Sequence, residues 1–198
     1  MASASKQISL TPEEYLTRER QADFKSEYHD GQIYAMSGAR RPHNLIAANL
    51  SRVLGNQLAD RPCELYIADM RVRVETTGSY SYPDLVAVSG EPRFADGEFD
   101  TLLNPDLVIE ILSPSTESWD RGGKFANFRR LESLQDYVLV SQDKSHVEHF
   151  ARQGNQWLLT EWDHLEDTLR LASIGCDVAL REIYAKVRFS SGDVAPGA

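Results

Sequence analysis

The order of apolar and polar positions divides the chain into short segments with either a helical or a strand repeat. The first helix is marked most clearly, because Thr11 can cap it, Pro12 suits its first position and Glu14 completes a capping box. A helical repeat covers residues 11–20, 44–59, 124–131 and 178–186. Strand patterns cover 24–37 as a hairpin, 64–74, 83–88, 107–112, 136–141, 146–151 with 156–162 as a second hairpin, and 169–171.

This succession predicts an α/β protein of the α+β type, with a mixed β-sheet flanked by helices. We expect one domain over residues 10–187, with disordered tails at 1–9 and 188–198. The chain has 198 residues, 41% of them hydrophobic, which suffices for one core. Residues 89–105 are polar and form a long loop that we interpret as functional or covering.

Composition and charge limit where the protein is expected to act and what it is expected to bind. Its apolar runs stop short of the roughly 18 residues that a membrane span needs, and residues 1–6 are not followed by an apolar segment of the kind found in signal peptides. The only cysteines, Cys63 and Cys176, lie far apart, which favours a reducing, cytoplasmic location. The formal charge of −9 argues against a broad positive surface for phosphates, but not against a local basic cleft or a bound metal.

Glu110 is the residue that most demands an explanation. It lies inside the apolar run 107–112, which has the composition of a central strand buried on both faces. A buried carboxylate costs several kcal/mol or more unless a cation, a metal, a base or a set of hydrogen-bond donors pairs with it. One interpretation is an ion pair with Arg71 or Arg73.

The other interpretation is a metal site. Asp84 follows Pro83 at the start of a second buried strand, and Lys124 follows the strand of Glu110. If these strands are neighbours, Asp84 and Glu110 converge and form, with the Ile111 carbonyl, a hard oxygen site for Mg²⁺ or Mn²⁺. Lys124 would orient a water or stabilise developing charge. The alternative for Asp84 is a turn cap.

Other polar residues admit two readings each. Glu27 is either a third carboxylate of this site or a solvated strand residue, and His43 is either a substrate or second-layer contact or a packed residue at a helix start. Asp120, four residues before Lys124, is interpreted as a local helix-start or ion-pair residue. The aromatic residues Trp119, Phe125 and Phe128 are interpreted as core rather than as a base-stacking platform.

Several motifs together resemble the Uma-two family, whose members are restriction-endonuclease-like proteins of the PD-(D/E)-x-K nuclease superfamily. They are Pro83-Asp84, then Glu110-Ile-Leu-Ser-Pro-Ser-Thr116, then Asp120-x-x-x-Lys124, preceded by Glu27, Asp30-Gly31-Gln-Ile-Tyr34-x-Met36-Ser37-Gly38 and His43. The resemblance covers roughly residues 10–185. It implies a restriction-endonuclease-like core, Asp84 and Glu110 as metal-binding carboxylates, Lys124 as a migrated catalytic lysine and Glu27 as an added acidic residue.

The sequence departs from that pattern at four positions. Leu112 stands where the usual motif has its lysine, Phe128 where a tyrosine is expected, and Val138 and Ser141 where a tryptophan and an aspartate are expected. These departures affect details of the expected site and leave its main carboxylates in place.

We therefore expect a Mg²⁺- or Mn²⁺-dependent endonuclease that hydrolyses phosphodiester bonds, with DNA as its nucleic acid. Substrate contacts are expected from His43, Arg71 and Arg73. A homodimer is expected from the resemblance and from the apolar hairpin after residue 146. The charge of −9 favours an alternative, a non-catalytic interaction or nucleic-acid-binding protein that retains the nuclease fold. A third reading, a two-carboxylate hydrolase acting on sugars, is opposed by the lysine nearby.

Overall fold

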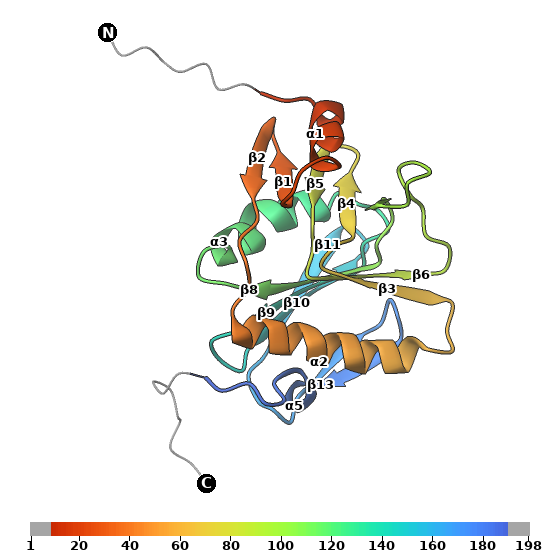
Figure 1. Cartoon of the computed structure of the whole chain (residues 1–198). Coiled ribbons are helices and arrows are strands. Elements are labelled where there is room, and N and C mark those ends of the chain that lie inside the picture. Colours follow the sequence, from red (N-terminus) through yellow and green to blue (C-terminus); the bar gives the residue numbers. More distant parts are fainter. Residues whose placement is uncertain (1–8, 190–198) are drawn as a thin grey trace.

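The structure, a computed structural model, describes residues 9–189, so the expected tails lie almost entirely outside the described residues. Within that range the strands form three sheets (Figure 1). The six-stranded sheet has the order β11 (Gln156–Trp162), β10 (Val147–Gln153), β9 (Asp136–Ser141), β8 (Leu107–Leu112), β6 (Leu85–Ser89), β3 (Cys63–Ile67). The five-stranded sheet has the order β2 (Gln32–Ala35), β1 (Ser26–His29), β5 (Ser79–Ser81), β4 (Arg71–Val74), β7 (Thr101–Leu102), and β12 (Thr168–Leu171) pairs with β13 (Cys176–Ala179).

The helical segments are short except for one. They are α1 (Pro12–Glu19), α2 (Arg41–Leu58), α3 (Glu117–Trp119), the π-helix η1 (Asp120–Lys124), α4 (Phe125–Phe128) and α5 (Leu180–Ile183). Sheets of mixed direction flanked by helices confirm the expected α+β class. None of the helices within residues 9–189 has the length and apolar character to cross a membrane.

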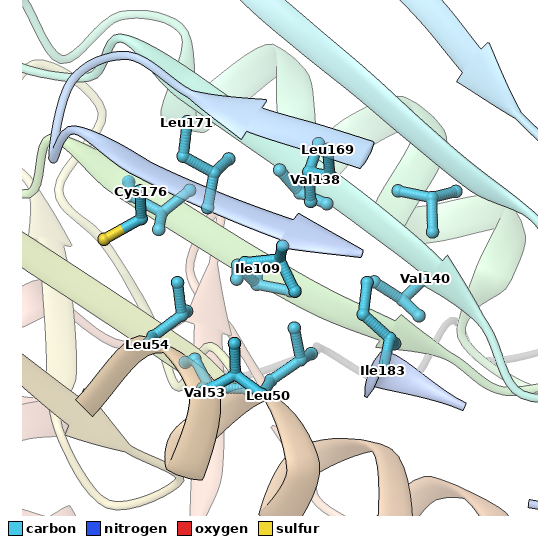
Figure 2. Packing of buried hydrophobic residues seen from close by; sticks show 14 of the residues in the cluster. Leu50, Val53, Leu54, Ile109, Val138, Val140, Leu169, Leu171, Cys176 and Ile183 are labelled. Carbon is cyan, nitrogen blue, oxygen red and sulfur yellow. The ribbon is translucent and has the colours of Figure 1, made fainter. Parts of the chain in front are cut away.

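One face of the six-stranded sheet is covered by α2. The helix presents the apolar stripe that its sequence predicts, including Leu50, Val53 and Leu54, to Ile109 of β8 and Val138 of β9 (Figure 2). Figure 1 shows α5 and β13 on the same side of the sheet, where Leu169, Leu171, Cys176 and Ile183 complete this cluster.

The opposite face carries a second cluster, in which Phe125 and Phe128 of α4 pack on Tyr137 and Leu139 of β9. The five-stranded sheet and α1 lie on this side of the molecule (Figure 1). Because side chains alternate along a strand, Glu110 of β8 faces this side, between Val108 and Leu112 of the same cluster. Every residue of β8 is buried, as the apolar run predicts.

The hairpin of β1 and β2 brings Glu27 to the same region. Its turn has Asp30 and Gly31 at φ values of 49° and 82°, a pair of positive angles that the Asp-Gly sequence accommodates in a tight hairpin. Tyr28 of the hairpin packs with Tyr15 of α1 and Tyr80 of β5. The predicted capping box of Thr11 and Glu14 is present at the start of α1.

Several elements differ from the prediction. Residues 64–74 form two strands in different sheets, because Ala68 turns the chain at φ 51°. Strand β5 (Ser79–Ser81) is an additional strand, and β7 lies in the predicted loop 89–105. The predicted helix 178–186 is a strand end followed by the short α5, and the region before α4 winds as a π-helix.

Candidate active site

The two carboxylates on the buried strands lie opposite each other. Strands β6 and β8 are antiparallel with Leu85 opposite Ile109, so Asp84 is level with Glu110, one position beyond the paired ladder. Asp84 is fixed at two points: its Oδ2 accepts a hydrogen bond from the Ile111 amide at 2.7 Å, and its Oδ1 lies 3.2 Å from Nε2 of His43. His43 reaches it from the first turn of α2.

Lys124 is the cation that Glu110 requires. Its Nζ lies 2.9 Å from Oε1 of Glu110, 2.9 Å from Oε1 of Glu27 and 3.7 Å from Oδ1 of Asp120. The side chain is buried, so these contacts are poorly screened by water. Neither arginine of the alternative interpretation contacts Glu110.

The π-helix η1 places Asp120 and Lys124 on the cluster together. Single π-turns are rare and occur frequently at functional sites. The turn is anchored from below, because the Tyr137 hydroxyl donates to the Asp120 carbonyl oxygen at 2.9 Å. The pairing of Asp120 with Lys124 agrees with its interpretation as an ion-pair residue, although its burial within the cluster was not expected.

Glu27 enters from the five-stranded sheet. The Tyr82 amide donates to its Oε1 at 3.0 Å, and Nε2 of His29, two residues along the same strand, lies 3.5 Å from its Oε2. Glu27 is buried, which excludes the reading of a solvated strand residue. We refer below to Glu27, Asp84, Glu110, Asp120 and Lys124 as the carboxylate–lysine cluster.

The environment changes the proton affinity of these groups. Burial would raise the pKa of Glu27, but Lys124, His29 and the Tyr82 amide outweigh it and lower that pKa to about 2. Burial raises the pKa of Glu110 well above its ordinary value, and neighbouring carboxylates add to this while Lys124 opposes it. Burial would lower the pKa of Lys124, yet the carboxylates around it raise that pKa well above the usual range. The surrounding carboxylates thus favour the charged form of Lys124.

The cluster holds more negative than positive charge. Four carboxylates face one ammonium, so a proton or a further cation is favoured there. Glu110 Oε1 touches Lys124 but has no hydrogen bond of good geometry within residues 9–189. Oxygen ligands of this type suit Mg²⁺ or Mn²⁺. No three acidic, histidine or cysteine side chains of the described chain already surround a common point, so an ion requires rearrangement of the cluster.

Two of the expected substrate contacts lie elsewhere. Arg71 is 3% exposed and binds Tyr82, Thr101 and Asp100, so its guanidinium stabilises the five-stranded sheet from within. This burial corrects the expectation that Arg71 contacts substrate. Arg73 packs over the Tyr80 ring and lies 3.7 Å from Glu13.

Sequence reasoning overlooked two parts of this site. His29 lies beside Glu27, and their spacing of two along a strand could have placed both on one face. Tyr82 joins Glu27, through its amide, to Glu19 and Arg71, through its hydroxyl, and no local pattern indicates this contact.

The motifs and the geometry agree with comparisons to known proteins. A family profile described as "Uma2: Putative restriction endonuclease" matches residues 12–181. The chain belongs to the Uma2 family. It is 42% identical to "Uncharacterized protein sll1609" of Synechocystis sp. over 153 residues, which cover 77% of this chain and 86% of that protein. It is 40% identical to "Uncharacterized protein slr1290" of the same organism over 182 residues, 91% and 94% of the two chains.

A solved structure shares the fold of this Uma2 protein. It is titled "Crystal structure of a putative nuclease belonging to DUF820 from Anabaena variabilis ATCC 29413 at 1.96 A resolution". The TM-score is 0.73 at 17% identity, over 89% of this chain and 98% of that chain. The likeness shows that the two chains share one fold.

Proposed function

We propose that this Uma2 protein is an endonuclease that hydrolyses phosphodiester bonds of DNA with Mg²⁺ or Mn²⁺. The observation that carries the proposal is the burial of Lys124 between Glu27 and Glu110, with Asp84 level with Glu110 on the adjoining strand. A buried group of this charge is costly for stability, and such groups are characteristic of sites that perform chemistry.

Each side chain has a role in this proposal. Asp84 and Glu110 would hold the ion, with Glu27 and the Ile111 carbonyl as further ligands. A bound divalent ion polarises a phosphoryl oxygen and lowers the pKa of its water. Lys124 holds the attacking water or the charge that develops on the phosphate. His43 and the Ile111 amide fix the orientation of Asp84.

The surface beside the cluster supports a phosphate ligand. Arg40 and Arg41 are exposed at the start of α2. Arg41 precedes His43, which contacts Asp84, by two residues. The N-terminus of a helix carries partial positive charge and free amide donors, both of which favour anions. A local basic entrance of this kind is compatible with the overall charge of −9.

A second candidate function is a nucleic-acid-binding or interaction protein that retains the fold without catalysis. The position of Lys124 favours it, because the ammonium already neutralises part of the carboxylate charge that an ion would otherwise compensate. This candidate predicts that no divalent ion supports cleavage.

Cleavage of DNA by the purified protein separates the two candidates. Wild type should cut DNA with Mg²⁺ or Mn²⁺ and stop when chelator is added. Glu110→Gln removes a ligand charge at nearly constant shape and should abolish cleavage. The control is Asp136→Asn, which alters a buried carboxylate on the opposite face of the same sheet, where it binds His149 and Ser173. Equal loss in both variants, or no cleavage by wild type with any divalent ion, would refute the proposal.

A further inference from the structure

Two exposed aromatic rings flank the buried His29 beside the carboxylate–lysine cluster. The Trp119 ring lies 4.9 Å from the His29 ring and the Tyr34 ring lies 6.1 Å from it, between ring centroids. Trp119 is 37% exposed and Tyr34 is 51% exposed, whereas His29 is almost fully buried. The expectation that Trp119 belongs to the core is therefore wrong, although Phe125 and Phe128 are core residues as predicted.

The Trp119 ring is held in place by the helix below it. Gly123 lies one turn on, and a Cβ at that position would come within 1.9 Å of the Trp119 ring. The glycine thus lets the indole lie against the backbone of η1. The Trp119 ring also contacts the His29 ring, with 67° between the ring planes. An exposed tryptophan with this support presents a fixed surface to a ligand.

Both rings lie on or next to the elements that carry residues of the carboxylate–lysine cluster. Tyr34 is directly opposite Glu27 in the β1–β2 ladder, so the two side chains share one face of the hairpin. Trp119 directly precedes Asp120, and His29 contacts Glu27, which contacts Lys124. One side chain, that of His29, therefore lies between each ring and Glu27 of the cluster. We call Trp119 and Tyr34 the aromatic pair.

The chemistry of this surface matches a nucleobase that is not stacked within a duplex. Aromatic side chains bind such bases face to face, and every base offers a π-face. A chain with a net charge of −9 can neutralise few phosphates, so it depends more on contacts of this kind than a basic nuclease does. Bases inside an intact duplex are stacked on each other and do not reach such rings without being extruded.

We infer that the substrate is single-stranded or locally unpaired nucleic acid, one base of which stacks on the aromatic pair while its phosphodiester lies at the carboxylate–lysine cluster. This inference rests on the proposed function and specifies its substrate class. It assigns Trp119 and Tyr34 to substrate selection.

The test compares binding of a short fluorescent single strand with binding of the matching duplex. Anisotropy is measured with chelator present, so that the strand stays intact. Wild type should bind the single strand more tightly. Trp119→Ala and Tyr34→Ala should each weaken that binding by about 5- to 150-fold, the range for loss of one stacked base, and Trp119→Phe should restore part of it. The control is Phe99→Ala, which removes a still more exposed ring from the loop before β7 and should leave binding unchanged.

An abasic nucleotide provides an independent measurement. The abasic nucleotide is placed at each position of the strand in turn. At one position it should weaken binding to wild type, and at that same position it should not weaken binding to Trp119→Ala further. The inference fails if Trp119→Ala and Tyr34→Ala bind the single strand as wild type does, if wild type prefers the duplex, or if neither form binds. The cleavage assay with Glu110→Gln decides the proposed function separately, because an enzyme that cuts duplex DNA without using Trp119 would retain that function and refute only this inference.

Discussion

Replacement of Lys124 by methionine removes the cation of the cluster while keeping most of its aliphatic length. The interactions of Glu27 lower its pKa from 4.5 to about 2, which corresponds to about 3 kcal/mol in favour of the charged form. Lys124 is the largest of the influences that lower it. Breaking a buried ion pair by removing one partner typically costs about 3–5 kcal/mol. We therefore expect Lys124→Met to lose about 3 kcal/mol of unfolding free energy near pH 8.

The loss should depend on pH with a definite sign. A carboxylate whose folded pKa is lowered contributes stability above its unfolded pKa, and the contribution is lost as pH falls through the folded pKa. For Glu27 this window runs from 4.5 down to about 2. The difference between Lys124→Met and wild type should thus be full at neutral pH and shrink under acid conditions.

Urea unfolding followed by circular dichroism measures this difference. The control is Lys25→Met, which breaks an exposed pair with Asp69 whose Nζ–Oδ1 distance is 2.6 Å. Exposed pairs contribute about 0–1 kcal/mol, so this variant should remain close to wild type. A Lys124→Met protein as stable as Lys25→Met near pH 8 would refute the electrostatic account of the cluster.

Three further expectations concern other parts of the molecule. Gly123→Ala should displace the Trp119 ring and destabilise the fold by about 1–3 kcal/mol. Gly122→Ala, whose added Cβ meets no atom within 4 Å, should leave stability unchanged. Thermal melting measures the stability of both variants. Burial raises the folded pKa of Glu110, so the contribution of Glu110 to stability is lost as pH rises above the ordinary glutamate pKa. Glu110→Gln should therefore gain stability relative to wild type with rising pH in metal-free urea titrations. A difference that stays constant with pH would contradict this sign. The homodimer stays a prediction, and the edge strand β11, which exposes Leu158 and Leu159, is its candidate contact. On this prediction Leu158→Lys should shift sedimentation from dimer to monomer, and a monomeric wild type would remove the prediction.

The sequence predicted the centre of the site through one energetic argument. Glu110 stands in an apolar run, and a charge in such a strand needs a partner. The structure provides that partner, Lys124, and the strand order brings Asp84 level with Glu110. Their roles in metal binding and catalysis stay predictions.

Three features that the sequence did not reveal depend on backbone conformation or on long-range packing. The break between β3 and β4 occurs at Ala68, whose positive φ nothing in its residue type indicates. In the sequence Arg71 cannot be told from a surface arginine. Its contacts with Asp100, Thr101 and Tyr82 hold it in the five-stranded sheet. Trp119 is a large apolar residue of the kind that usually packs in a core, and its residue type does not indicate that it lies partly exposed against Gly123 of η1. For Arg71 a tertiary contact overrides the local pattern, whereas Ala68 and Trp119 depend on local backbone conformation.

The rate of single-turnover DNA cleavage by Lys124→Met in Mn²⁺ tests the central claim most directly. An ammonium is not a metal ligand, so the variant should still bind Mn²⁺, measured by electron paramagnetic resonance, under conditions where circular dichroism shows it folded. Its cleavage rate should fall by about 10²- to 10⁴-fold, the usual contribution of a charge-stabilising or proton-transferring group. Cleavage by folded, Mn²⁺-bound Lys124→Met at the wild-type rate would contradict the assignment of this cluster as the catalytic centre.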